Sequence, residues 1–187
     1  MAISRRLLLL ICMVCTKVLN VKTRPIDFVC DVRARRNMNN VKDLEVAMAS
    51  CSGSEQLPSP VPVPCVFIHK AIWENKSLQQ KHAEVRWALE VLLNSVNQVW
   101  IQSPQGSCQS SLLEGLEHGV KNHLHIVNGL GIQGDTGDSR PACFSQETQS
   151  VSQILRLYGR LLQGKLECLS RDLCNCATVQ TPHTEHL

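Results

Sequence analysis

Cysteine is the residue type in this chain whose number and placement point to a definite chemistry. The sequence has 187 residues and ten cysteines, and two of them, Cys12 and Cys15, lie close to its start. The others are Cys30, Cys51, Cys65, Cys108, Cys143, Cys168, Cys174 and Cys176. Such a set forms disulfides in an oxidising compartment and favours metal or redox chemistry inside the cell. The destination of the chain therefore decides what these residues do.

The beginning of the chain is typical of a secretory leader. Residues 1–6 are short and basic, and residues 7–14 form an apolar run that is too short to span a membrane. We expect residues 1–23 to be a signal peptide, cleaved near residue 16 or near residue 23. Cleavage before Arg24 leaves 15 basic residues against 16 acidic ones, so the formal charge of +3 becomes −1. We therefore expect a secreted product with disulfides, with no affinity for nucleic acid and no insertion into a membrane.

Two other patterns are similar to active sites or binding sites and have simpler explanations. Residues 159–165 have the spacing of a phosphate-binding loop, but Leu166 replaces the magnesium-binding Ser or Thr and no strand precedes the segment. Among His118, His123 and His125, neighbours are two or five positions apart, so they do not share a helix face as ligands of one metal would. The sequence predicts no enzyme, no cofactor and no metal site.

Apolar periodicity predicts the elements that carry the cysteines. Apolar residues recur three, four or seven positions apart in residues 31–50, 72–100, 109–130 and 146–173, which we interpret as four helices. The first of these patterns is the weakest. Signals for strands are sparse, so the expected fold class is all-α.

The connections between these helices are long, short and long. Four prolines in residues 58–64 favour an extended path, and glycines and a proline in residues 131–141 interrupt the third connection. The second, residues 101–108, is brief and makes its flanking helices antiparallel neighbours. Either long connection can cover the ~30 Å length of a 20-residue helix. This predicts an up-up-down-down four-helix bundle with two long crossovers.

The cysteines test this topology independently. Cys30 and Cys51 lie at opposite ends of the first helix and are too far apart to pair. In the up-up-down-down arrangement Cys51 comes near Cys108, whereas an up-down-up-down bundle would separate them. A Cys30–Cys174 pair fits either topology, and Cys176 could replace Cys174. The predicted bridges are Cys30–Cys174 and Cys51–Cys108.

The topology constrains the other cysteines and the glycosylation site less. Cys65 and Cys143 lie on the two crossovers, which could meet along one side of the bundle, and we predict that they pair. Cys168 and Cys176 stay unassigned. Residues 75–77, Asn-Lys-Ser, form the N-glycosylation acceptor of the chain, and we predict a glycan on Asn75.

From about Cys30 to Cys174 the chain resembles the thrombopoietin and erythropoietin family of helical cytokines. Cys-Asp-x-Arg at residues 30–33 is similar to the opening motif of that family. Residues 57–64, followed by Trp73, are similar to its first crossover. The segment from Leu-Tyr to Gly-Lys at residues 157–165 is similar to its fourth-helix motif. The order and spacing of these motifs carry the resemblance.

Within the family, the chain resembles the thrombopoietin branch more than the erythropoietin branch. Residues 108–113, Cys-Gln-Ser-Ser-Leu-Leu, are similar to the former, and erythropoietins usually place a second cysteine soon after the one that ends the first helix. Residues 52–55 contain no cysteine. The chain departs from mammalian thrombopoietins because it has no long glycosylated C-terminal domain and has four additional cysteines. We expect a cytokine domain at residues 24–176 and a short flexible tail at 177–187.

The resemblance implies a secreted hormone, monomeric in solution, that binds two chains of a class I cytokine receptor. The implied effect is proliferation and maturation of megakaryocyte or thrombocyte precursors. An erythropoietin-like hormone is the alternative within the family. A secreted four-helix carrier of small hydrophobic ligands is the alternative outside it, although regular leucine stripes indicate a filled core.

The resemblance also assigns two receptor-binding faces. In the family, one face combines the fourth helix, part of the first helix and the first crossover, and the other combines the first and third helices. By position, the first face receives Ile68, His69, Arg156, Arg160, Gln163, Gly164 and Lys165. The second face receives Asp31, Arg33, Asn37 and Lys121. For Lys165 an alternative is that its stem covers the core while its ammonium group reaches water.

Overall fold

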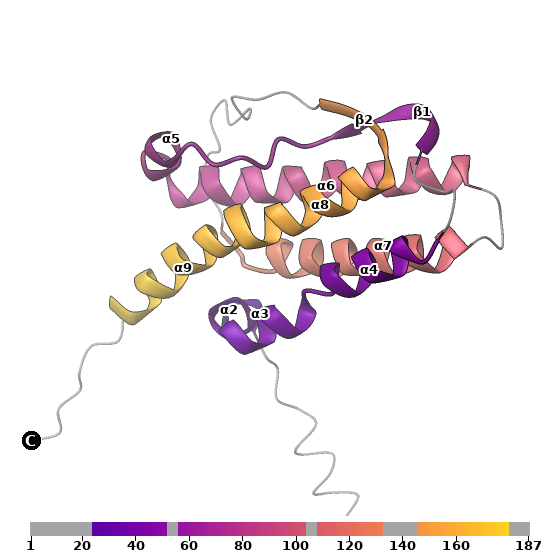
Figure 1. The fold of residues 1–187 in the computed structure, drawn as a ribbon. Coiled ribbons are helices and arrows are strands. Elements are labelled where there is room, and N and C mark those ends of the chain that lie inside the picture. The colour runs from indigo at the N-terminus through magenta and orange to yellow at the C-terminus, as the bar shows by residue number, and fades with distance from the viewer. Residues whose placement is uncertain (1–23, 52–55, 104–107, 133–145, 180–187) are drawn as a thin grey trace, which may run out of the picture.

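The computed structural model describes residues 24–51, 56–103, 108–132 and 146–179, with side chains described as far as Asn175 (Figure 1). The predicted signal peptide and the tail from residue 180 onward lie outside the described residues. In the part of the chain that is described, none of the helices has both the length and the apolar content of a membrane span.

The range predicted as the first helix, residues 31–50, contains two short helices, α3 (Val32–Met38) and α4 (Val41–Ala49), and a third short helix, α2 (Pro25–Cys30), precedes it. These three helices together are called the first rod. Asp31 has extended backbone angles, and its carboxylate accepts the N–H groups of Arg33 and Ala34, so it ends α2 and caps α3. Asn39 is also extended, and its side-chain oxygen accepts the N–H of Val41. Short polar side chains that bond nearby backbone groups interrupt the helix at both places. The prediction of one continuous helix over 31–50 was wrong for this reason.

The second predicted helix has a turn near its start. The short α5 (Lys70–Glu74) precedes α6 (Leu78–Gln102). Between them Ser77 and Gln80 form a capping box, in which each side chain accepts the backbone N–H of the other residue. The third predicted helix is α7 (Cys108–Asn128), close to the expected range.

The fourth predicted helix is α8 (Val151–Leu161), a π-helical turn η1 (Leu162–Leu166) and α9 (Glu167–Val179). Residues 146–150, expected to be helical, form a strand instead. This strand, β2 (Gln146–Ser150), pairs antiparallel with β1 (Gln56–Val63) in the other crossover. The two crossovers therefore meet along one side of the bundle, as the sequence suggested.

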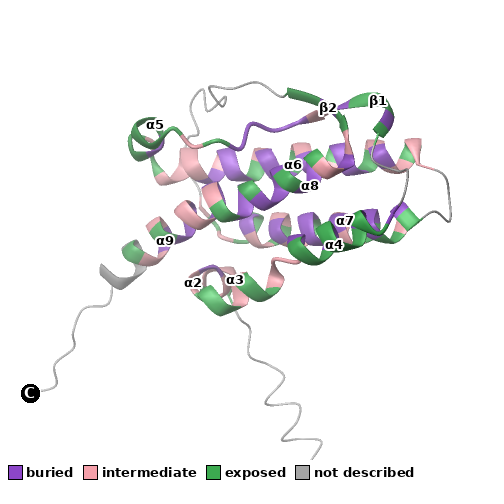
Figure 2. Cartoon of the chain, viewed as in Figure 1, coloured by how far each residue is buried: buried purple, intermediate pink, exposed green. Residues whose placement is uncertain are grey.

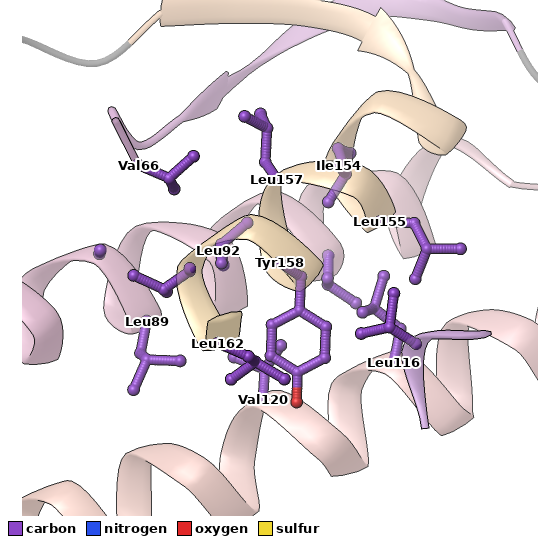
Figure 3. Packing of buried hydrophobic residues seen from close by; sticks show 14 of the residues in the cluster. Val66, Leu89, Leu92, Leu116, Val120, Ile154, Leu155, Leu157, Tyr158 and Leu162 are labelled. Atoms are coloured by element: carbon purple, nitrogen blue, oxygen red, sulfur yellow. The ribbon is translucent and has the colours of Figure 1, made fainter. Parts of the chain in front are cut away.

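The helices form the predicted up-up-down-down bundle. Figure 1 shows α6, α7 and the α8–α9 rod lying along one another, with α4 against α7 and the two strands beside α6. Their inner faces are apolar and almost completely buried (Figures 2 and 3). The largest fully buried side chains include Leu89, Leu92, Leu113, Leu116, Leu155 and Tyr158.

Glycines on α7 allow neighbouring segments to approach this helix closely. A Cβ atom on Gly115 would lie 2.9 Å from a methyl group of Leu44, and one on Gly119 would lie 2.9 Å from the hydroxyl oxygen of Tyr158. Just after α7, a Cβ on Gly129 would lie 2.7 Å from the ring of Pro25. These glycines serve the packing of α2, α4 and α8 against α7.

Candidate functional site

Two disulfides join the ends of the bundle and confirm the predicted pairs. Cys30 and Cys174 are bonded with their Cα atoms 5.6 Å apart, and Cys51 and Cys108 with theirs 5.7 Å apart. The second bridge joins the end of α4 to the start of α7, which an up-down-up-down bundle would not allow. Cys65 is also disulfide-bonded, but its predicted partner Cys143 lies outside the described residues, so that pair stays a prediction.

The sequence predicts no disulfide partner for Cys168 or Cys176. Cys168 is a free thiol of intermediate exposure on α9. The side chain of Cys176 is not among those described. Eight positions separate the two residues along one helix, which is ~12 Å at ~1.5 Å per residue. That separation exceeds the reach of a disulfide, so these two cysteines do not pair with each other while α9 is intact.

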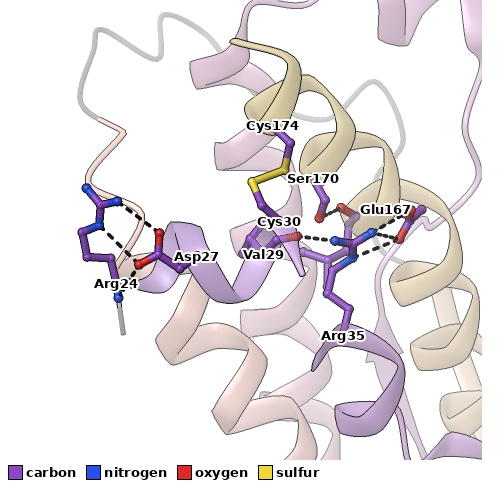
Figure 4. Close-up of a disulfide and its surroundings, with 9 residues drawn as sticks. Arg24, Asp27, Val29, Cys30, Arg35, Glu167, Ser170 and Cys174 are labelled. Carbon is purple, nitrogen blue, oxygen red and sulfur yellow. Dashed lines mark hydrogen bonds and ion pairs between the residues drawn. A yellow bond between two sulfur atoms is a disulfide. The ribbon is translucent and has the colours of Figure 1, made fainter. Parts of the chain in front are cut away.

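A partly buried ion pair strengthens the corner at Cys30–Cys174. The guanidinium of Arg35 on α3 binds Glu167 on α9 through two nitrogens, at 2.9 Å and 3.1 Å, and also donates to the carbonyl of Val29 (Figure 4). Planar pairing of this kind fixes orientation as well as distance. Arg35 therefore fastens α3 to the rod formed by α8, η1 and α9. Of the three arginines on α3, Arg33 and Arg36 are exposed and Arg35 is not.

Three of the residues assigned to the first face, Arg160, Gly164 and Lys165, meet the crossover where it passes along α8 and η1. Gln163 instead lines a groove beside α3, and Arg156 lines one beside α4. Ile68 lies next to Gly164, where an added Cβ would be 3.5 Å from the Ile68 terminal methyl. Arg160 lies on the same side of the rod, and its guanidinium carbon is 5.5 Å from the centre of the Phe67 ring. Four assigned residues are exposed: His69, Arg156, Arg160 and Gln163.

Lys165 is buried beneath this face, and the expectation that it is on the surface or extends to water was wrong. It is 2% exposed. Its ammonium group donates to the carbonyl of Cys65 at 2.6 Å and contacts a carboxylate oxygen of Glu84 at 2.6 Å. Helical angle alone could not reveal this, because both partners come from segments far away in the sequence. Lys165 connects the crossover, α6 and η1.

Glu84 is the centre of a small charged cluster. Its carboxylate receives Lys165 on one oxygen and Lys76 on the other, and the residue is only 6% exposed. Burial alone would raise the pKa of Glu84, but the hydrogen bonds from Lys165 and Lys76 outweigh it and hold that pKa below its ordinary value. The carboxylate is thus ionised, and it holds both lysines in place.

Phe67 is a residue of this region that the sequence analysis missed. Its side chain is 65% exposed, which is unusual for a large aromatic, and it stacks under Arg160. The neighbouring Val66 is buried, so Phe67 is the point where the buried crossover turns a large apolar side chain outward. The sequence holds no clear signal for this, because residues 66–68 are all apolar. The first face therefore has an apolar centre as well as charged groups.

The residues assigned to the second face are all exposed but lie on two helices. Asp31, Arg33 and Asn37 lie at or on α3, where the carboxylate of Asp31 is engaged in capping. Lys121 lies on α7 and pairs with Glu117 at 2.7 Å, one turn earlier. Within the described residues, no hydrogen bond or ion pair joins Lys121 to the α3 group. The structure places these side chains on the surface without connecting them.

The glycosylation acceptor is accessible. Asn75 is exposed in the turn between α5 and α6, and Ser77 of the acceptor sequence is the cap of α6. A glycan at this turn would not need to displace buried groups. Its presence stays a prediction.

Comparison with known proteins adds to this geometry. A family model described as "Erythropoietin/thrombopoietin" matches residues 27–178. The erythropoietin of Epinephelus coioides is 25% identical over 161 residues, covering 81% of this chain and 83% of that protein. The erythropoietins of Bos taurus and Ovis aries are each 22% identical over 161 residues, covering 80% of this chain and 84% and 83% of theirs. The segment that matches the family contains every residue of both assigned faces.

Proposed function

Because the chain belongs to the erythropoietin/thrombopoietin family, we propose that it is a secreted hormone that joins two receptor chains through the two faces described above. This family consists of cytokine hormones and not of enzymes, and its members bind class I cytokine receptors. Pairing of two receptor chains by one hormone brings their intracellular kinases together. The signal would then be carried by the receptors, and the hormone supplies a rigid shape.

The observation that carries this proposal is the packing of the first crossover against α8 and η1 at the first face. Phe67 and Arg160 form a contact of an exposed aromatic with a guanidinium, and Lys165 holds the same segment from below. Exposed aromatics and arginines are the residue types that contribute most to binding at protein interfaces. A rigid support beneath them reduces the entropy lost on binding.

Two target cells are each favoured by one observation. The Cys51–Cys108 bridge supports the thrombopoietin-like assignment, with megakaryocyte or thrombocyte precursors as targets. The relatives named above are erythropoietins and support erythroid precursors. Cells that carry one receptor type and a transcriptional reporter would separate these possibilities. The receptor type that responds to the mature chain at the lower concentration identifies the target.

The two-face arrangement is tested with charge reversals in the same cells. We predict that Arg160→Glu at the first face and Lys121→Glu at the second each impair signalling while the helix content by circular dichroism is unchanged. Phe67→Ala should weaken receptor binding by about 2 kcal/mol or more, close to 30-fold in Kd, because it removes an aromatic anchor.

Arg86→Glu is the matched control, since Arg86 is an exposed arginine on α6 that belongs to neither face. If both charge reversals signal like the unmodified hormone, the two-face assignment is wrong. If Arg86→Glu impairs signalling equally, the effect is one of overall charge.

A further inference from the structure

A histidine and a tyrosine meet inside the bundle in a contact that neither face uses. Nδ1 of His123 on α7 lies 2.8 Å from the hydroxyl oxygen of Tyr158 and 2.9 Å from the carbonyl oxygen of Gly119. The two side chains are 4% and 0% exposed. Figure 3 shows the ring of Tyr158 directed from α8 toward α7, with its oxygen at the helix.

The protonation state of Nδ1 decides which of these hydrogen bonds forms. A bare Nδ1 accepts the O–H of Tyr158, whereas a protonated Nδ1 donates to the carbonyl of Gly119. When the imidazole is charged, both ring nitrogens carry protons. The hydroxyl proton of Tyr158 then needs another acceptor.

The side-chain oxygen of Asn40 lies near Gly119, and no hydrogen bond joins it to the Tyr158 hydroxyl in this structure. Oδ1 of Asn40 is buried and has no hydrogen-bond partner among the described residues. A Cβ atom on Gly119 would lie 2.9 Å from the Tyr158 hydroxyl oxygen and 3.3 Å from this Oδ1, so both oxygens border the same small space. Asn40 is the residue that begins α4, directly after the break from α3. The hydroxyl of Tyr158 therefore contacts His123 on α7 and lies near Asn40, where the first rod breaks between α3 and α4.

We propose that His123, Tyr158 and Asn40 form a proton-responsive joint. When His123 takes up a proton, the O–H of Tyr158 turns from His123 toward Asn40, and the packing of α4 against α7 and α8 loosens. Above neutral pH the joint is closed and the two faces are held in their relative positions.

Charged groups of α3 and α9 lie near His123. His123 lines a groove of about 250 Å³ together with Arg35 and Arg36 from α3, Glu167 from α9 and Gln163 from η1. Arg35 and Glu167 are paired with each other, so burial is the main opposition to protonation of His123. On α8 the facing group is Tyr158, and on α4 it is the neutral Asn40.

The direction of the pH effect follows from these surroundings. Burial lowers the pKa of His123 below its ordinary value, and the hydrogen bond to the Gly119 carbonyl opposes this only in part. The unfolded chain therefore takes up the proton first, near pH 6.5. The stability that His123 contributes is complete above about pH 6.5 and is lost as the pH falls through the folded pKa. If the proposed function holds, a hormone internalised with its receptor meets this range, at about pH 5 to 6.

The experiment uses the mature, disulfide-bonded chain without a receptor, so it is independent of the proposed function. Denaturant unfolding is measured at pH 7.5 and pH 5.5 for the unmodified protein, for His123→Asn and for His118→Asn. His118 is an exposed histidine on the same helix and is the matched control. We expect the unmodified protein and His118→Asn to lose stability in acid by the same factor, of which His123 contributes at most about tenfold in the folding equilibrium for each pH unit. His123→Asn should lose less, and an equal loss overturns the proposal.

Two further measurements cover the case in which His123→Asn does not fold. In the unmodified protein, NMR titration should give His123 a midpoint below the ordinary histidine value of about 6.5, and an equal or higher midpoint overturns the proposal. Asn40→Ala should enlarge the loss of stability between pH 7.5 and pH 5.5, because it removes the oxygen that accepts the Tyr158 hydroxyl proton when His123 is charged. An unchanged acid loss in Asn40→Ala overturns the part assigned to Asn40. His82, which is also buried and lies 2.8 Å from the Val127 carbonyl, is present in every variant and cancels from the comparison.

Discussion

The region of the first face contains side chains in opposite environments. Phe67 is exposed although it is apolar, and Lys165 is buried although it is charged. Each departs from the usual preference of its residue type, and each has a partner that explains it: Arg160 for Phe67, and Glu84 with the Cys65 carbonyl for Lys165. A partner from a distant segment cannot be identified in one sequence. The sequence analysis placed Lys165 in this region but not its burial, and it missed Phe67.

The role of Lys165 as an internal support can be measured. Lys165→Met keeps most of the length of the side chain and removes its charge, so Glu84 retains only Lys76 and the Cys65 carbonyl loses its donor. Removal of one partner from a buried ion pair costs about 3 kcal/mol or more. We expect a loss of that size in the free energy of unfolding, measured by guanidinium unfolding with circular dichroism.

Lys121→Met is the matched control, because Lys121 forms an exposed pair with Glu117 on one helix. Pairs of this type contribute less than about 1 kcal/mol. Equal stabilities of the two variants would mean that the charged cluster under the first face is not a support.

At the scale of elements, the strongly periodic segments were predicted well and the weakly periodic one was not. Residues 72–130 and 151–173 contain long apolar stripes, and α6, α7 and the α8–α9 rod follow them closely. The first rod contains Asp31, Asn39 and Asn40, whose side chains can bond the backbone locally. A helical pattern records which side is apolar, but it does not record whether a polar side chain ends the helix.

The strand pairing shows a different limit of the sequence. Prolines in β1 indicated an extended chain, but Gln146–Ser150 is a polar stretch with no local preference for a strand. It becomes β2 because it lies beside β1, with Val61 opposite Thr148 and Val63 opposite Gln146. The pairing follows from the fold, since the two long crossovers of this topology lie on the same side.

Close approach to α7 at Gly119 is open to a test at this scale. Gly119→Ala should gain about 1 kcal/mol in helix propensity and lose about 1 to 3 kcal/mol through overpacking against the Tyr158 hydroxyl, with a net loss of stability. The same substitution in a Tyr158→Phe background should cost less, because the phenylalanine ring lacks the oxygen that the new methyl group meets. Denaturant unfolding of the four proteins gives the coupling between the two sites.

Gly115→Ala is the matched control. Its new methyl group would meet the end of the Leu44 side chain, which can turn aside more readily than an aromatic ring. If Gly115→Ala lowers the free energy of unfolding more than Gly119→Ala does, then the contact between Gly119 and Tyr158 is not the one that tolerates an added methyl group least.

At the scale of the whole molecule, disulfides and crossovers determine one another. Long first and third connections allow α4 to end beside the start of α7, and only that arrangement brings Cys51 within reach of Cys108. The opposite corner is held by Cys30–Cys174 together with Arg35–Glu167. The first rod, which is broken into three helices, is thus fastened at both ends. This matters for the proposed function, which assigns α3 to the second face and the crossover after α4 to the first.

The bridge at Cys51–Cys108 closes a loop of 57 residues. In the chain-entropy account, loss of a bridge across a loop of that length costs roughly 4 kcal/mol of stability. We predict that the double variant Cys51→Ala with Cys108→Ala loses about this much by denaturant unfolding. Cys168→Ala, which removes a free thiol, should change stability by less than about 1 kcal/mol.

Signalling should fall more steeply than stability in the double variant. Release of the end of α4 from α7 lets the first rod and the crossover move relative to the third helix, so the two faces no longer keep a fixed separation. Binding of a single receptor chain to the first face should therefore survive at a temperature where the variant is folded, while the response that needs two chains is reduced. Peptide mapping of the unreduced protein that found Cys51 joined to any residue other than Cys108 would remove the basis for this topology and for the fixed relation of the two faces.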